Sequence, residues 1–310
     1  MGKPDTATRE YINDSRVFAD VFNYFIYSGR KVLKPQNLEK LDASTLLTVF
    51  GKDGDEEKIQ RYRDALRKAT LMTDDEAAYI VLGIEAQTHV DYGMPIRTFL
   101  YDALQCDSQA RKIKAAHMNA EDKHSEDEFV SGLYREDRIL PVITVVLHFG
   151  AASWDGVTRL SDLYHCQHDE LLAFAPDYRM NLIDPAGMTD DDFDKFTTSL
   201  GKVLKFMKLS NSRKEMKKLM ETDEAYRRID RNAARVLREC ANISLDIDSN
   251  QEVVDVCGAW KEEQQNAAIK SSIDTARRYG ISDDRILADI ISQFGLTKEE
   301  ARSYLMKESA

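Results

Sequence analysis

One short segment near the middle of the chain does most to limit the possible folds. Residues 140–150, LPVITVVLHFG, are rich in β-branched side chains and almost continuously apolar. Such a strand is covered on both faces, as in a parallel sheet flanked by helices, because a strand with one solvated face alternates polar and apolar residues. The segment therefore predicts an α/β protein with a buried strand. His148, inside this run, is expected to be a core histidine with satisfied hydrogen bonds.

The residues before this strand supply the other elements of an α/β core. Apolar side chains recur at helical spacing through residues 14–28, and Asp14 can cap the start of that helix. The other predicted elements are strands at 45–50, 61–73 and 78–87, a helix from Met94 to about Ala116, and a polar loop or frayed helix end at 119–128. The order is helix, three strands, helix, strand, so we expect a compact α/β core that extends to about residue 185.

From Thr189 onward the pattern is almost wholly helical. The segment Thr297-Lys298-Glu299-Glu300, for example, is a capping box that starts the last helix. We therefore divide the chain into a core at 1–185 and a mainly helical region at 186–310. The helices form either a separate accessory unit or a cover for the sheet. Their spacing fits a helix-turn-helix DNA reader or, more commonly, a plain helical hairpin.

The charge of the chain is unevenly distributed. Its net charge is -11 over 310 residues, which argues against a nonspecific polyanion binder, because phosphate contacts need Lys and Arg. Residues 201–239, however, hold twelve Lys and Arg against six Asp and Glu, a local charge of +6. This basic segment is either a nucleic-acid surface or a solvated helix face. Its candidate phosphate contacts are Lys202, Lys205, Arg213 and Lys214.

The N-terminus and the cysteines indicate a cytoplasmic protein. The first residues contain no apolar stretch behind a basic head, so no signal peptide is expected. The longest apolar run, residues 139–149, is too short to span a bilayer, so no membrane partner is expected. Four cysteines without CxxC spacing fit a reducing cytoplasm better than a disulfide framework.

The turn of the predicted hairpin brings two acidic residues together. If the turn is centred between Asp74 and Asp75, the numbers of facing residues sum to 149, which places Asp64 opposite Glu85. Their Cβ atoms would then lie about 5 Å apart. Two facing carboxylates repel each other unless a cation lies between them, and a divalent metal ion removes that penalty.

Alternation along the second strand gives this pair a polar neighbour. Even-numbered residues in 78–86 face an apolar core, whereas Glu85 and Gln87 face the other way. Oxygen ligands of this kind suit Mg²⁺ or Mn²⁺, with the carbonyl of Ala86 as a further ligand. Gln87 cannot act as a general base, but it can orient the attacking water in a metal-dependent phosphodiesterase. The alternatives are two exposed acids on an edge hairpin, or a register shifted by one residue, which moves Asp64 to the other face.

Three segments resemble a known nuclease core. They are RYRDAL at 61–66, YIVLGIEAQ at 79–87 and HVDYGMPIRTFLYDALQ at 89–105, and together they resemble the PD-(D/E)XK nuclease superfamily. The nearest resemblance is to the recombination-promoting nuclease family (Rpn, YhgA-like), which is associated with transposases. The shared order is an Asp before a hairpin, Glu-x-Gln on the next strand, and then Asp, Met-Pro, Arg and Tyr around the start of a helix. Here these residues are Asp64, Glu85-Ala86-Gln87, Asp91, Met94-Pro95, Arg97 and Tyr101.

The resemblance implies a restriction-endonuclease-like αβββαβ core and a Mg²⁺-dependent DNA endonuclease linked to recombination or mobile elements. It implies that Asp64 and Glu85 hold the metal and that Gln87 positions water. Arg97 would contact the phosphate, or would only form a surface ion pair with Asp91. DNA would be the partner. Cutting both strands would call for two active sites, and hence for a homodimer.

Two departures from the family pattern keep a second function open. The signature Lys is Gln87 here, which removes a cation that would stabilise the transition state, although the Rpn-like branch resembles this chain in that substitution. The Pro of the signature Pro-Asp pair is Arg63. In many superfamily members an acid of the first helix assists the metal; Asp14 or Asp20 could do so here, or could simply lie at the surface. The rival hypothesis is a catalytically inactive DNA-binding or interaction module that keeps the nuclease fold.

Overall fold

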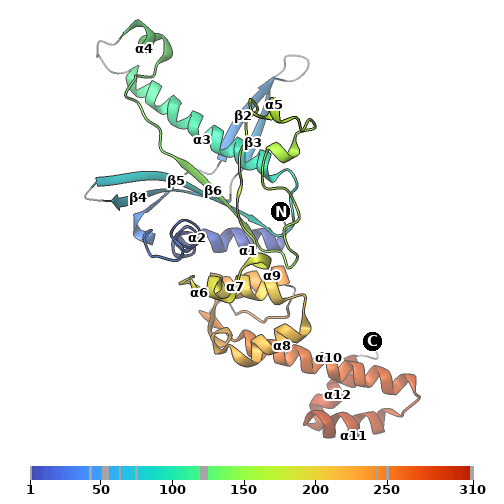
Figure 1. The fold of residues 1–310 in the computed structure, drawn as a ribbon. Helices are drawn as coiled ribbons and strands as arrows, with labels where there is room; N and C mark the ends of the chain where they lie inside the picture. The colour runs from blue at the N-terminus through green and yellow to red at the C-terminus, as the bar shows by residue number, and fades with distance from the viewer. Residues whose placement is uncertain are drawn as a thin grey trace.

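The structure is a computed structural model that describes residues 2–41, 44–50, 56–62, 64–73, 76–118, 125–241, 243–248 and 251–307. It is an α/β protein, which confirms the predicted class. A five-stranded mixed sheet with helices on both faces forms the N-terminal part, and a helical region follows it (Figure 1). No helix within those ranges is long and apolar enough to cross a membrane.

The central strand of the sheet is β5 (Glu76–Gln87), which has neighbours of opposite direction on its two sides. β4 (Ala65–Thr73) runs antiparallel to it, and β6 (Val142–His148) runs parallel to it. The apolar run that predicted a buried strand is β6, whose last five residues are all buried. The order across the sheet is β1-β4-β5-β6-β7. The remaining strands are β1 (Leu38–Lys40), β7 (Asn181–Ile183) and a separate hairpin of β2 (Ser44–Phe50) and β3 (Glu56–Tyr62).

Helices α1 (Lys3–Ile12) and α2 (Ser15–Tyr27) cover one face of the sheet, and α3 (Met94–His117) covers the other (Figure 1). Side chains of α1 and α2 form one buried apolar cluster with the even-numbered residues in 80–86 of β5. The odd-numbered residues of β5 face α3 and carry the candidate site. The predicted alternation is therefore confirmed for the described side chains of β5.

The helical region has two apolar cores. Its helices are α6 (Asp190–Asp194), α7 (Leu200–Leu209), α8 (Arg213–Thr222), α9 (Arg231–Ala241), α10 (Val256–Arg278), α11 (Asp283–Phe294) and α12 (Lys298–Lys307). The helices from α6 to the start of α10 share the large cluster with α1 and α2, and α9 packs directly on α1 (Figure 1). The rest of α10 and the last two helices have a smaller cluster of their own and extend away from the body in Figure 1. The division at residue 185 stays a prediction, because the large cluster runs across it from Ala7 to Cys257.

Several boundaries differ from the prediction. The strand predicted at 61–73 is in fact the end of β3 and the whole of β4, because the chain bends at Asp64. Helix α1 was not predicted, since only a narrow stripe of its residues is buried. Part of the predicted loop at 119–128 is helical, because Ser125 starts a capping box there; residues 119–124 lie outside the described ranges. The short elements are α4 (Glu126–Ser131), α5 (Asp169–Leu172), 3₁₀ turns at Pro35–Asn37, Ser161–Leu163, Pro185–Gly187 and Glu224–Arg228, and a strand pair of β8 (Ile229–Asp230) and β9 (Val253–Val254).

Candidate active site

The β4–β5 hairpin has the predicted register. Leu66 lies opposite Gly83, so the numbers of facing residues sum to 149. The two residues at the centre of the predicted turn lie outside the described part of the chain. Asp64 is the residue immediately before β4, and the same register places it beside Glu85.

A backbone hydrogen bond holds the Asp64 carboxylate at the end of the hairpin. The N–H of Ala86 donates to its Oδ2 atom over 2.9 Å. Burial raises the pKa of Asp64, while the hydrogen bond from Ala86 and the charge of Arg97 oppose that increase. The Asp64 carboxylate therefore accepts the hydrogen bond that a main-chain carbonyl of β4 would accept if the strand continued. This hydrogen bond fixes the carboxylate beside Glu85.

Glu85 is fully buried and is paired with a cation from the facing helix. Its Oε2 atom lies 3.0 Å from Nη2 of Arg97. Arg97 also donates to Oδ2 of Asp91 over 3.4 Å and to the hydroxyl of Tyr101 over 3.1 Å. Burial alone would lower the pKa of Arg97, but Glu85, Tyr101 and Asp64 together raise it above its ordinary value. The predicted pair with Asp91 is thus only part of the environment of a charged Arg97.

The first turn of α3 directs Arg97 toward the sheet. Asp91 accepts a hydrogen bond from the N–H two residues later, at 2.9 Å, and so shapes the turn before the helix. Pro95 follows in the first turn, where a proline has no helical hydrogen bond to lose. Met94 is buried in a small cluster with Val146 of β6, which anchors this end of the helix on the sheet. Arg97, three residues after Met94, then reaches Glu85.

The strand pairing shows in which direction Gln87 and the carbonyl of Ala86, the other predicted groups of the site, point. Odd-numbered residues of β5 hydrogen-bond to β6, so the main-chain groups of even-numbered residues point to the β4 side. The carbonyl of Ala86 therefore points toward the side that Asp64 occupies. The side chain of Gln87 shares a sheet face with that of Glu85, and the strand partner of Gln87 in β6 is His148.

His148 belongs to the same sheet face as the candidate site. Its ring is buried, and Nε2 donates to the carbonyl of Ala152 over 3.0 Å. Nδ1 has no hydrogen-bond partner among the residues that the structure describes. The prediction of a core histidine is confirmed, but satisfaction of both ring nitrogens is not.

A third acid, Asp5, approaches the site from α1. Its Oδ1 atom accepts a hydrogen bond from the hydroxyl of Thr88 over 3.4 Å, and its charge contributes to the raised pKa of Asp64. No sequence pattern indicated this, because only the packing of α1 against β5 brings Asp5 there. Within the described ranges, no three Asp, Glu, His or Cys side chains are close enough to hold a metal ion. A metal at this site would therefore bind two carboxylates and complete its shell with main-chain and water oxygen, as Mg²⁺ commonly does.

No protein-family model, curated protein or solved structure matches this chain. The resemblance to the Rpn family therefore stays a prediction. It depends on the motif residues alone.

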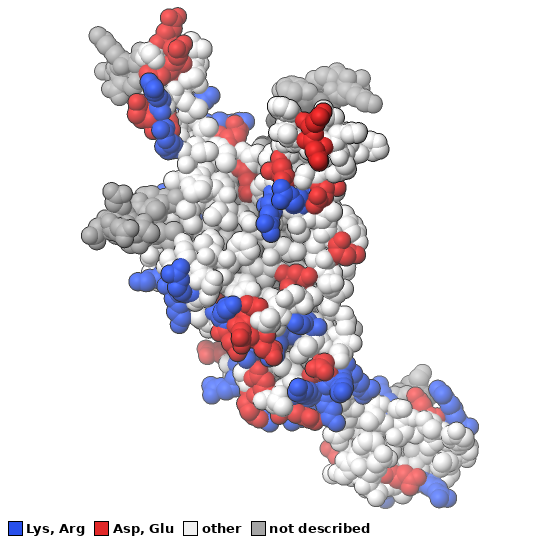
Figure 2. All heavy atoms as spheres, viewed as in Figure 1, with Lys and Arg blue, Asp and Glu red and all other residues white. Residues whose placement is uncertain are grey.

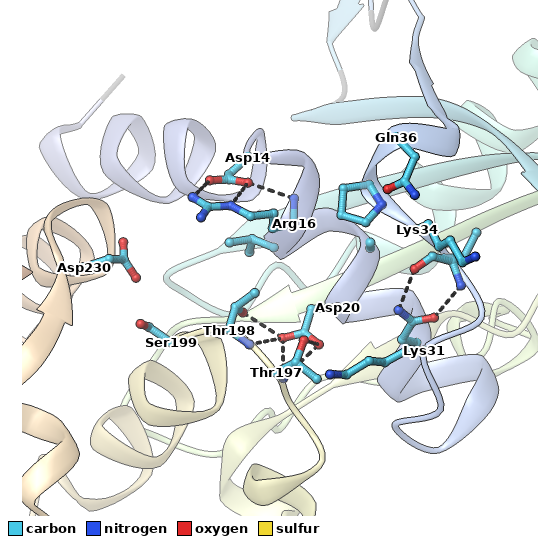
Figure 3. Close-up of a pocket in the computed structure, with 15 residues that line it drawn as sticks. Asp14, Arg16, Asp20, Lys31, Lys34, Gln36, Thr197, Thr198, Ser199 and Asp230 are labelled. Carbon is cyan, nitrogen blue, oxygen red and sulfur yellow. Dashed lines mark hydrogen bonds and ion pairs between the residues drawn. The ribbon is translucent and has the colours of Figure 1, made fainter. Parts of the chain in front are cut away.

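The two acids of the predicted first helix line a separate cavity (Figure 3). Asp14 caps α2 and pairs with Arg16 over 2.7 Å. Asp20 is buried and accepts hydrogen bonds of 2.7–3.0 Å from the main-chain N–H and hydroxyl groups of Thr197 and Thr198. Both acids line a cavity of about 630 Å³ between the N-terminal helices and the start of α7. The hydrogen bonds of Asp20 give it a structural role, so the alternative of simple surface exposure is wrong for this residue.

The basic segment at 201–239 does not form a continuous cationic surface. Lys202 and Lys205 are each paired with an aspartate, at 2.9 and 2.8 Å. Arg213 and Lys214, at the start of α8, are exposed and form no ion pair with any residue in the described ranges. On the face shown in Figure 2, basic and acidic side chains are interleaved over these helices. Of the four candidate phosphate contacts in this segment, Arg213 and Lys214 are therefore the two that pair with no acid among the described residues.

Proposed function

We propose that the chain is a metal-dependent DNA endonuclease of the Rpn type. Its restriction-endonuclease-like αβββαβ core would consist of α2, β1, the β4–β5 hairpin, α3 and β6. The observation that carries the proposal is the bond from Ala86 to Asp64 directly beside the buried Glu85. Burying carboxylates together is costly unless cations compensate them. Arg97 supplies one positive charge, and a divalent ion would supply the rest.

Each residue of the site has a role in this proposal. Asp64, Glu85 and the carbonyl of Ala86 would hold Mg²⁺ or Mn²⁺. When bound, the ion supplies a Lewis acid for the phosphate and lowers the pKa of a bound water. Gln87 orients the attacking water through its amide but does not take up its proton. Arg97, in the first turn of α3, donates its remaining N–H groups to a non-bridging phosphate oxygen and so supplies the charge that a Lys at position 87 would provide.

DNA contacts beyond the site would come from Arg213 and Lys214, which have exposed charges on α8. These contacts would be to the phosphate backbone and would not read sequence. Cutting both strands of a duplex requires two copies of the site, so we propose that the enzyme acts as a homodimer.

A catalytically inactive DNA-binding or interaction module is the second candidate. It is favoured by the ion pair between Arg97 and Glu85, because this pair already neutralises Glu85. Gln87 also favours it, since an amide adds no positive charge to the site.

Incubation of the protein with supercoiled plasmid DNA and Mg²⁺ or Mn²⁺ separates the two candidates. We expect wild type to cut and Asp64→Ala to be inactive. Asp14→Asn is the matched control, because it changes an acid outside the site and an Asn still caps a helix. DNA binding by wild type without cutting in any divalent ion would support the inactive module, and equal cutting by Asp64→Ala would contradict the proposed site.

A further inference from the structure

Arg67 is a buried cation with no acidic partner among the residues that the structure describes. It is 2% exposed and lies on the face of β4 that packs against α1 and α2. No carboxylate in the described part of the chain is within ion-pair distance of Arg67, and its guanidinium lies 5.3 Å from the ring centre of Phe18. Burial accordingly lowers the pKa of Arg67. Burying such a charge costs folding free energy. The hydrogen bonds of Arg67 therefore indicate what this residue contributes to the structure.

The guanidinium of Arg67 fixes the corner between α1 and α2. Nη1 donates to the carbonyl of Leu66 over 3.2 Å. Nη2 donates to the main-chain carbonyl of Asn13 over 3.0 Å and to its side-chain Oδ1 over 3.3 Å. Because a guanidinium can only donate, the Oδ1 atom of Asn13 must face Arg67 and its NH₂ group must point the other way.

The NH₂ group of Asn13 then reaches Asp64. Its Nδ2 atom donates to the main-chain carbonyl of Asp64 over 3.0 Å and to the carbonyl of Arg9 over 2.8 Å. Asp64 precedes β4, so the strand itself does not hold its main chain. The Asn13 amide holds that main chain from the helix side, while the N–H of Ala86 holds the carboxylate from the sheet side.

We propose that Arg67 and Asn13 are positioning residues for Asp64. Arg67 orients the Asn13 amide, and the amide fixes the main chain of Asp64 so that its carboxylate meets Ala86 beside Glu85. A catalytic carboxylate must be held within about 0.5 Å of its productive position, so loss of this support reduces activity without touching the reacting groups. The effect on activity rests on the proposed function, whereas the effect on the Asp64–Ala86 hydrogen bond does not.

Two substitutions at Asn13 separate positioning from folding. Asn13→Asp keeps an acceptor for Arg67 and adds a charge that pairs with it, but it replaces the donor to Asp64 by an oxygen. Asn13→Ala removes the side chain without adding charge, and so tests the same bond if the charge in Asn13→Asp disturbs folding. Asp14→Asn is the matched control, because it exchanges carboxylate and amide at the next position, where the side chain contacts Arg16 instead.

Amide hydrogen exchange of Ala86, measured by NMR, reports the bond to Asp64 without metal or DNA. We expect exchange at Ala86 to accelerate about tenfold in both Asn13 variants, because the bond to Asp64 weakens. Exchange at Leu82, further along β5, should not change, and Asp14→Asn should leave both amides as in wild type. Unchanged exchange at Ala86 in both Asn13 variants would overturn the proposal.

Mn²⁺ titration by calorimetry and plasmid cleavage then distinguish this proposal from the proposed function. If wild type binds Mn²⁺ and cuts, the Asn13 variants should bind Mn²⁺ about tenfold more weakly and lose kcat with little change in KM. If wild type neither binds Mn²⁺ nor cuts, but exchange at Ala86 responds as expected, the positioning role stands and the proposed function fails. If both variants cut as well as wild type, the positioning role fails and the proposed function stands.

Discussion

Removal of Arg97 should reveal how much the site depends on one ion pair. Arg97→Met takes away the guanidinium and leaves the fully buried Glu85 without this cation. Breaking a buried pair by removing one partner costs about 3–5 kcal/mol. The Arg97 side chain is 35% exposed, so solvent already screens the pair, and we reduce the expected loss to about 2–4 kcal/mol.

Proton uptake by the carboxylate limits this loss and makes it depend on pH. Protonating a carboxyl group with an ordinary glutamate pKa of about 4.3 costs about 3.7 kcal/mol at pH 7 and about 1 kcal/mol at pH 5. The stability that the variant loses cannot exceed this cost of protonation, because Glu85 can take up a proton rather than remain charged. In the folded variant the protonated form of Glu85 is favoured. The loss of stability is therefore small when the pH is near the ordinary glutamate pKa, and it grows as the pH rises.

Urea unfolding measures the free energy of unfolding at both pH values. We expect Arg97→Met to be about 2–4 kcal/mol less stable than wild type at pH 7 and at most about 1 kcal/mol less stable at pH 5. Adding Glu85→Gln should recover most of the loss at pH 7, because position 85 then carries no buried charge. Arg16→Met, which removes an exposed cation, is the control and should change stability by less than about 1 kcal/mol. An equal loss at both pH values, or a double variant no more stable than the single one, would refute this reasoning.

Three further predictions test the other charged residues. Asp64→Asn should abolish cleavage and raise the free energy of unfolding by about 1 kcal/mol at pH 7 but not at pH 3. The reason is that burial raises the pKa of Asp64 and disfavours its charged form. Chemical unfolding at the two pH values measures this effect, and no gain at pH 7 would contradict it. Asp20→Ala should lower the free energy of unfolding in urea by about 2–4 kcal/mol, because donors of Thr197 and Thr198 lose their acceptor. Cleavage by the folded protein should stay unchanged. A loss below about 1 kcal/mol would count against the structural role of Asp20. The double variant Arg213→Gln/Lys214→Gln should lower the slope of log affinity for DNA against log salt by about 2 in fluorescence anisotropy, and an unchanged slope would remove both residues from the DNA surface.

The register of the hairpin could be predicted from the sequence alone. Even-numbered residues in 78–86 are apolar, so only pairings that keep them on one buried face are consistent with a core. Turn residues between the two strands then select one of these pairings, and the structure has that register. The buried strand β6 and the helix capped by Asp14 were predictable for the same reason, since periodicity and capping are local properties of the chain.

The neighbours of Asp64 and Glu85 could not be predicted in this way. Asp5, Asn13 and Arg97 reach the hairpin from helices that pack on opposite faces of the sheet. Sequence spacing within one element says nothing about which residues of another element lie opposite it. The sequence also gave no sign that Arg67 would be buried, because a cation on a strand is ordinarily exposed.

The amino-acid sequence by itself determined the α/β class, the register of β4 with β5 and the two carboxylates at its end, because these follow from short-range periodicity and turn chemistry. The tertiary structure decided which charges surround those carboxylates. Distances between elements depend on how the helices pack against the sheet, and that packing is a property of the whole core.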